Sequence, residues 1–237
     1  MHAWNRIKYE YRNRPLIEFL KWFYRAARGT ISVKFHGLLS DLIGEENYLR
    51  YLKKWRCRKL DPEKYIEIMK ISPEEIEHVS STREKQKWFS TGKIRKGDWD
   101  RNLDRYNDLP FHRAMTKHIE KGLDWRDIKE VQKAREGGIK WPGKPYKVDR
   151  DIEKTEKLLE SIKEHGYQTQ EQIHDISYEE AEKNWRLKAL NEICVDLDRD
   201  GNPLFVDGRH RLSIAKILGL EEIPVRVITR HRNYLKK

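Results

Sequence analysis

The sequence predicts an α/β or α+β protein with a small mixed sheet and flanking helices. Residues 65–71 alternate apolar and polar side chains, as a strand does, whereas residues 149–165 carry apolar side chains at helical spacing. Residues 192–228 then suggest a strand, a turn, a second strand, a helix and a third strand. Both periodicities in one chain are typical of helices packed on a sheet.

Most of the remaining elements are expected to be helices. Ser72 and Pro73 begin a helical turn after the first strand, with Ser72 as N-cap and Pro73 at the first helical position. Gly122, Asp124 and Trp125 suggest a helix end, a cap and a buried aromatic ring. Longer helices are predicted over residues 14–28, 45–55, 110–121, 124–135 and 177–188.

The final third is the most regular part of the sequence. Strands are expected over residues 192–197, 204–206 and 223–228, with a turn at 198–203 and a helix at 211–218. The first two strands should form a hairpin.

Composition indicates a folded protein without a membrane span. Charged residues (38%) slightly outnumber hydrophobic ones (37%), but eight Trp are too many for a disordered chain. The sequence contains no run of roughly 20 apolar residues and no signal peptide, so we expect a cytoplasmic protein. Cys57 and Cys194 lack the spacing of a metal site and suggest small buried residues.

The positive charge is concentrated near the N-terminus. Residues 1–60 contain 14 Lys and Arg against 5 Asp and Glu, an excess of nine within a net charge of +11. We therefore divide the chain into a basic helical extension, residues 1–60, and a second domain, residues 61–237. Such an extension suits nucleic acid, an anionic membrane or an acidic partner, and charge alone does not choose among them.

The amphipathic pattern of residues 14–28 also leaves several roles open. This helix could pack on the protein's own core or on a second subunit, so self-association stays open. Basic aromatic helices also lie on membrane surfaces and contact nucleic acids.

Residues 207–211 suggest a phosphate-binding loop. A glycine lets backbone amides approach a ligand closely, and the amides at a helix start carry partial positive charge. Arg209, His210 and Arg211 add donors, and Asp207 precedes Gly208 at the end of the strand. The alternative is an ordinary turn whose arginines lie in solvent.

The surrounding residues 192–231 resemble the nucleotide-binding core of the ParB/sulfiredoxin superfamily. The resemblance includes Gly208, His210, Arg211, Ala215 and the strand entry at 223–225. It implies binding of a nucleoside di- or triphosphate by a superfamily that includes partition proteins, sulfiredoxins and free-serine kinases.

Two upstream segments are more weakly similar to the same family. Residues 68–76 resemble its opening strand and turn, and residues 158–168 resemble the helix before its second strand. Ser161 in that helix is added to the predicted nucleotide-binding residues. The core would then comprise residues 65–79 and 149–231, separated by a Trp-rich insertion at 80–148.

Departures from the family pattern exclude two of its activities. Arg209 stands where sulfiredoxins have the cysteine that performs their redox chemistry, and an arginine is not a sulfur nucleophile. Partition proteins carry a helix-turn-helix DNA reader after this core, and none follows here. We therefore expect neither sulfiredoxin activity nor the familiar form of DNA partition.

Asp98 and Asp100 are candidate catalytic and metal-binding residues. Magnesium in phosphoryl transfer needs only one or two carboxylates besides phosphate oxygens, and a carboxylate can also act as a base. The alternative is an acidic turn in which Trp99 anchors the chain to the core.

These features together predict a nucleotide-binding protein that acts as a Mg²⁺-dependent phosphotransferase or nucleotide hydrolase. A small hydroxyl-bearing molecule is a candidate acceptor. The alternative function is a non-catalytic nucleotide switch or adaptor that binds nucleic acid or membrane through residues 1–60.

Overall fold

The structure is a computed structural model that divides into two compact units, Met1–Lys54 and Trp55–Lys237. It describes residues 15, 18, 41–56, 65–82, 91–139, 141, 145–184 and 187–236. The helix predicted over residues 14–28 lies almost entirely outside this set, as does Cys57. The helix predicted at 45–55 is confirmed as α4, Glu45–Arg56.

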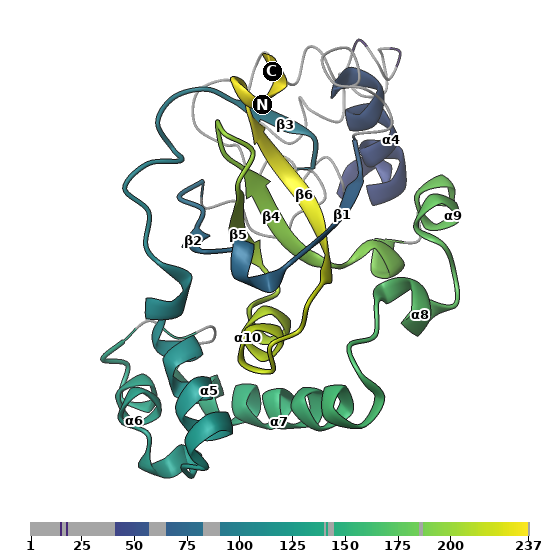
Figure 1. The fold of residues 1–237 in the computed structure, drawn as a ribbon. Helices are drawn as coiled ribbons and strands as arrows, with labels where there is room; N and C mark the ends of the chain where they lie inside the picture. The colour runs from purple at the N-terminus through teal and green to yellow at the C-terminus, as the bar shows by residue number, and fades with distance from the viewer. Residues whose placement is uncertain are drawn as a thin grey trace, which may run out of the picture. The chain divides into compact units, whose positions relative to one another are not determined.

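The larger unit is built on a six-stranded mixed sheet with flanking helices, which confirms the predicted fold class. Its strands are β1 (Glu67–Ile71), β2 (His78–Val79), β3 (Lys93–Arg95), β4 (Ile193–Leu197), β5 (Pro203–Asp207) and β6 (Ile223–His231). The order is β1-β6-β4-β5-β2, and β3 also pairs with β6. Figure 1 shows β6 and β4 at the centre of the sheet.

The predicted hairpin is confirmed, and residues 80–148 also contribute a strand to the sheet. Strands β4 and β5 pair antiparallel, with Leu197 opposite Pro203. Within the supposed insertion, β3 pairs in parallel with β6 along residues 229–231, so this segment contributes to the sheet. Strand β6 is longer than predicted, since its residues 229–231 pair with β3, and all nine of its residues are buried.

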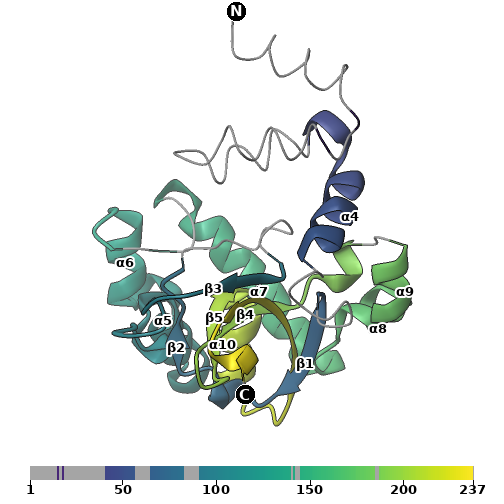
Figure 2. The same ribbon diagram turned by 90° about the horizontal axis from the view of Figure 1, so that it is seen from above.

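In Figures 1 and 2, helices lie to the left and to the right of the sheet's lower end, and α7 (Val148–His165) and α10 (Arg209–Ile217) lie between them. The bounds are α5 (Pro110–Lys121), α6 (Lys129–Arg135), α7 (Val148–His165), α8 (Gln170–His174), α9 (Tyr178–Lys183) and α10 (Arg209–Ile217). Short 3₁₀ turns are Pro73–Glu75, Tyr106–Asp108, Trp125–Asp127, Pro145–Lys147, Leu187–Leu190 and Tyr234–Lys236. No helix within the described residues is both long and apolar enough to cross a membrane.

Local capping explains where several helices begin and end. Ser72 forms a capping box with Glu75, as the Ser72-Pro73 pattern predicts. Gly122 ends α5 in the left-handed conformation, and Asp124 caps the following 3₁₀ turn. The helix predicted at 177–188 is instead α9 followed by a separate 3₁₀ turn, and α8 was not predicted.

Helix α10 lies between the sheet and the helical layer. Leu212 and Ala215 belong to a buried cluster with residues of β4, β5 and β6. Ile214, on another side of α10, packs with residues of α5, α6 and α7. All three side chains are fully buried, so α10 is fixed from both directions.

The junction between β5 and α10 requires a glycine. Gly208 has φ +94°, which L side chains rarely adopt. A Cβ at this position would lie 3.0 Å from Ile193 Cα on the neighbouring strand. The tight junction therefore lets the first turn of α10 approach β4 directly.

We expect Gly208→Ala to lower the free energy of unfolding by about 2–4 kcal/mol, through backbone strain and displacement of β4. Gly97 is a matched control, since it has φ +91° but no atom within 4 Å of an added Cβ. Gly97→Ala should lower the free energy of unfolding only through backbone strain, by about 1 kcal/mol. Urea unfolding measures both variants, and equal losses would show that contact with β4 is unimportant.

Candidate functional site

The first turn of α10 presents backbone amides without an internal acceptor. The first hydrogen bond of the helix runs from the amide of Leu212 to the carbonyl of Gly208, at 3.0 Å. The amides of residues 209–211 precede it, and Gly208 supplies no capping side chain. Asp207 Oδ1 instead accepts the amide of Gly208, at 2.8 Å. The amides of residues 209–211 are therefore free to bind a ligand, while the Asp207 carboxylate offsets part of the positive charge of the helix start.

A pocket of about 260 Å³ opens at this helix start. Its lining comes from α7 and from the beginning of α10: Lys154, Leu158, Gly208, His210 and Arg211. Three of the predicted phosphate-binding residues therefore line one pocket, while Asp207 and Arg209 are not among its lining residues. The Lys154 ammonium adds a positive charge that the sequence analysis did not identify.

Ser161 lies on the same face of α7 as the two α7 residues of the pocket. It follows Lys154 by seven positions and Leu158 by three, which is helical spacing. Its side chain is exposed and not part of the lining. The predicted role of Ser161 in nucleotide binding therefore stays a prediction.

Arg211 is held by a buried carboxylate. Its Nη1 lies 3.0 Å from Glu192 Oε2, and its Nη2 donates to the carbonyl of Asn191 at 2.6 Å. The Glu192 side chain is fully buried and also accepts from the amide of Gln170 and the hydroxyl of Tyr178, both at 2.6 Å. Arg211 therefore neutralises Glu192 and builds the pocket wall.

The tyrosines near this ion pair stay neutral hydroxyl groups. Burial, reinforced by the Glu192 carboxylate, raises the pKa of Tyr178. Burial likewise raises the pKa of Tyr167 to about 12, although Arg211 acts in the opposite direction. Both groups can therefore donate a hydrogen bond across the ordinary pH range.

Arg209 points away from the pocket wall formed by α7. Its guanidinium carbon lies 5.9 Å from the centroid of the Phe205 ring, within range of a cation–π contact. Its carbonyl accepts from the hydroxyl of Tyr106 at 3.0 Å, and the same hydroxyl lies 2.9 Å from Ser213 Oγ. These contacts tie α10 to the 3₁₀ turn that contains Tyr106.

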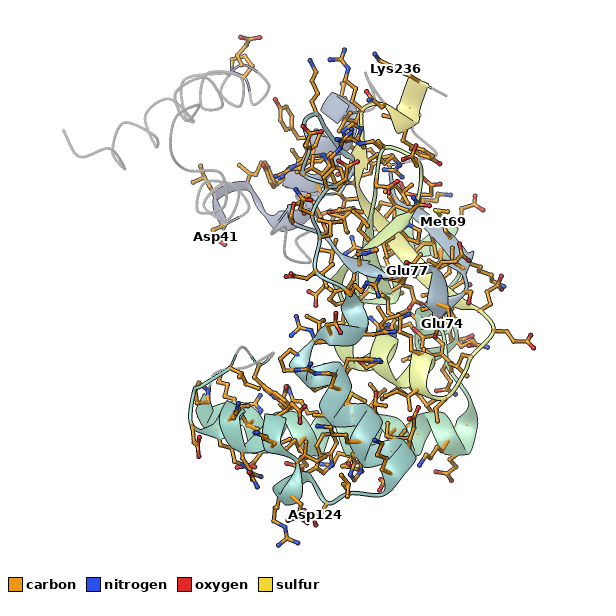
Figure 3. All side chains as sticks on the ribbon, turned by 60° about the vertical axis from the view of Figure 1, so that its left-hand side comes forward. Asp41, Met69, Glu74, Glu77, Asp124 and Lys236 are labelled. Carbon is orange, nitrogen blue, oxygen red and sulfur yellow. The ribbon has the colours of Figure 1, made fainter. Side chains whose placement is uncertain are left out.

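On the same side of α10, the buried Lys216 pairs with the exposed carboxylate of Glu74. Lys216 Nζ lies 3.3 Å from Glu74 Oε2, beside the turn that follows β1 (Figure 3). Burial, with a further contribution from the Lys216 charge, lowers the pKa of His112 to about 4. His112 is therefore neutral at physiological pH and lies in the packed interface between α5 and α10.

His210 projects from α10 into the pocket and meets α7. Its Nε2 lies 3.3 Å from Asp151 Oδ1, within ion-pair distance. Its ring packs edge-on against Phe111, with centroids 4.8 Å apart. The imidazole keeps 29% of its side chain exposed, so it remains accessible from the pocket. Sequence reasoning missed Asp151, which carries no motif of its own.

Asp98 and Asp100 lie elsewhere, around Arg199 in the turn between β4 and β5. Arg199 Nη2 is 2.7 Å from Asp98 Oδ1 and from Asp100 Oδ1. The hydrogen bonds from Arg199 lower the pKa of both carboxyl groups, that of Asp100 to about 2. The two aspartates hold the turn between β4 and β5 against the segment that follows β3. This structural role is similar to the alternative interpretation of Asp98 and Asp100 as an acidic turn.

Strand β5 separates this carboxylate pair from the pocket. Arg199 precedes β5 and Gly208 follows it, so the strand of five residues, roughly 13 Å long, lies between them. The structure therefore does not bring Asp98 and Asp100 to the α10 start, and it does not support their predicted catalytic role there. Among the described residues, no group of three or more His, Cys, Asp or Glu is arranged to hold a metal ion.

A second pocket, of about 460 Å³, lies around α8, α9 and the turn before β4. It is lined by His174, Asp175, Ile176, Glu180, Lys188 and Ala189. It is larger than the pocket at α10, but its lining mixes acidic and basic side chains and includes no start of a long helix. Its chemistry favours no particular class of ligand.

Comparisons of the chain with models of protein families, with curated proteins and with solved structures each find no match. The assignment of a function therefore depends on the site itself. The resemblance of residues 192–231 to the ParB/sulfiredoxin superfamily stays a prediction.

The buried ion pair generates a prediction about stability. Arg211→Ala leaves the Glu192 carboxylate buried without its cation and should lower the free energy of unfolding by about 3 kcal/mol. The double variant with Glu192→Gln should recover part of this loss. Arg126→Ala removes an exposed pair with Asp124 and should change stability far less than Arg211→Ala does. Chemical denaturation measures the free energy of unfolding of each variant. A large loss for Arg211→Ala supports a structural role, and a small loss would show that Arg211 is dispensable for folding.

The Asp100–Arg199 pair generates a prediction about pH. Because the folded-state pKa of Asp100 is depressed to about 2, its contribution to stability is fully present above its ordinary pKa of 3.8. It is lost as the pH falls through about 2. Wild type should therefore exceed Asp100→Asn in stability at pH 7, with the difference shrinking below about pH 4. The Asp98 side chain is 72% exposed, so Asp98→Asn should differ from wild type in stability much less than Asp100→Asn does. Equal losses of stability in the two variants would contradict the assignment of this pH dependence to Asp100.

Proposed function

We propose that the pocket at the start of α10 binds the phosphate groups of a nucleoside di- or triphosphate. The observation that carries this proposal is the convergence of uncapped first-turn amides with Lys154 and His210 on one pocket. Anions bind at such helix starts because the amides point at them and the helix dipole favours negative charge.

The dimensions of the pocket support recognition of the phosphate part of the ligand. Its volume of about 260 Å³ is slightly below the roughly 300–1,000 Å³ that is typical of whole small-molecule sites. A phosphate chain can lie inside while the base stays near the surface. Leu158 gives the pocket an apolar side that would exclude water from the bound phosphate.

The class of reaction that fits is phosphoryl transfer, either to water or to a small hydroxyl-bearing acceptor. The resemblance of residues 192–231 to nucleotide-binding proteins supports the nucleotide as the donor, and Arg209 in place of a cysteine argues against sulfiredoxin chemistry. Magnesium would accompany the nucleotide through its phosphate oxygens. The cytoplasm, where nucleoside triphosphates are plentiful, is the expected location.

The basic N-terminal segment supports a second candidate function. Its excess of nine positive charges over residues 1–60 favours a nucleotide-dependent switch or adaptor that binds nucleic acid or an anionic membrane. In this case nucleotide binding would occur without turnover. Self-association through the same segment stays open.

A charge-reversal pair tests the phosphate site. Lys154→Glu places a carboxylate at the pocket and should weaken binding of ATP, CTP, GTP or UTP with Mg²⁺ by about tenfold or more. Lys163→Glu, nine positions along α7 and therefore on its opposite side, makes the same change in net charge and should have little effect. Isothermal titration calorimetry measures both variants. Equal weakening by the two variants would indicate only long-range attraction, and no binding of any nucleotide by the wild type would refute the proposal.

A further inference from the structure

His210 and Asp151 form an imidazole–carboxylate pair at the edge of the pocket. Asp151 lies in the first turn of α7 and His210 in the first turn of α10, so two separate helices bring them together. Their closest atoms, Nε2 and Oδ1, are 3.3 Å apart. Nothing in the sequence places these residues next to each other.

The pair is incompletely satisfied within the described part of the chain. His210 Nε2 and Asp151 Oδ2 are buried, and neither has a hydrogen-bond partner there. The contact between Nε2 and Oδ1 has ion-pair distance without hydrogen-bond alignment. Catalytic hydrogen bonds are often long or poorly aligned before a ligand binds and tighten in the complex. A buried polar group without a partner is rare in a folded protein, and a catalytic role is one of its recognised explanations.

The protein fixes the orientation of the imidazole from two sides. The Phe111 ring meets it edge-on, with an interplanar angle of 71°, and Trp141 in turn packs against Phe111 at 5.2 Å. Phe111 and Trp141 are buried, so this support is rigid. The Asp151 carboxylate lies beside Nε2 of the same ring.

This arrangement favours one tautomer of His210. A carboxylate beside Nε2 stabilises a proton on that nitrogen, which leaves the lone pair on Nδ1. Nδ1 has no partner among the described residues, and His210 lines the pocket. Arg211 does not occupy this lone pair, because its guanidinium donates to Glu192 and to the carbonyl of Asn191.

We propose that His210 is the general base of a phosphoryl transfer in this pocket and that Asp151 is its positioning residue. The inference rests on the proposed binding of nucleoside triphosphate at the start of α10. In hydrolysis, Nδ1 takes a proton from water as the water oxygen forms a bond to the terminal phosphorus. The bond from that phosphorus to the bridging oxygen breaks, and the nucleoside diphosphate leaves with the electron pair. Asp151 stabilises the imidazolium that forms.

The test uses the full chain with Mg²⁺ and ATP, CTP, GTP and UTP in turn. Calorimetry gives the dissociation constant, and release of inorganic phosphate gives the turnover number at saturating nucleotide. His210→Gln should lower the turnover number about 100-fold or more. The dissociation constant should change far less, because the amides and Lys154 still hold the phosphates. Asp151→Asn should lower turnover about tenfold with a similar dissociation constant.

Asp149→Asn is the matched control. Asp149 lies in the same turn of α7 but pairs with Arg135 at 2.6 Å, away from the pocket lining. Its substitution should leave binding and turnover unchanged. Circular dichroism establishes that each variant is folded.

Histidine ¹⁵N NMR of the wild type tests the inference without any variant. The account predicts that the His210 ring carries its proton on Nε2 at neutral pH. A proton on Nδ1 would overturn the proposed role of the lone pair.

The outcomes separate this inference from the proposed function. Nucleotide binding without turnover, or undiminished turnover in a folded His210→Gln variant, would overturn the inference and leave phosphate binding in place. Binding of none of the four nucleotides by the wild type would overturn both.

Discussion

The burial of α10 on two sides is the constraint on which the rest of this structure depends. Leu212 and Ala215 pack into the sheet, and Ile214 packs into the helical layer, so the helix can neither rotate nor shift without opening a core. Gly208 then fixes where the helix begins, because only a residue without a side chain fits against Ile193 at that φ value. The open end of a fully packed helix is a rigid place at which to present backbone amides.

Buried charge organises the pocket wall around this helix start. Glu192 binds Arg211 and also accepts hydrogen bonds at the starts of α8 and α9, so one carboxylate joins three helices and the entry to β4. The free energy that it costs to bury the Glu192 carboxylate is offset only while all these partners are present. Arg211 therefore differs from a flexible surface arginine, and phosphate recognition by this chain depends more on the amides and on Lys154.

The local parts of this structure could be predicted from the sequence. The turn at 198–203 between two strand-like segments predicts the hairpin, and Gly122 with Asp124 predicts a helix end followed by a cap. Each of these signals acts over a few residues. Strand β3 was missed, since three residues pair with β6 only through contacts distant in sequence. Distance in sequence also explains why the partner of Asp98 and Asp100 was not predicted. Their spacing suggested a metal site, but their partner is Arg199, about a hundred positions away. Asp151 likewise gains its place at the pocket only when α7 packs on α10.

Amide chemical shifts measured during a nucleotide titration test the central claim most directly. If phosphate groups bind at the start of α10, adding ATP, CTP, GTP or UTP with Mg²⁺ should shift the amide signals of residues 208–212 first and most strongly. The signal of Lys154 should move with them. Shifts confined to residues 174–189, around the larger pocket, or to the basic segment before residue 60 would contradict the account.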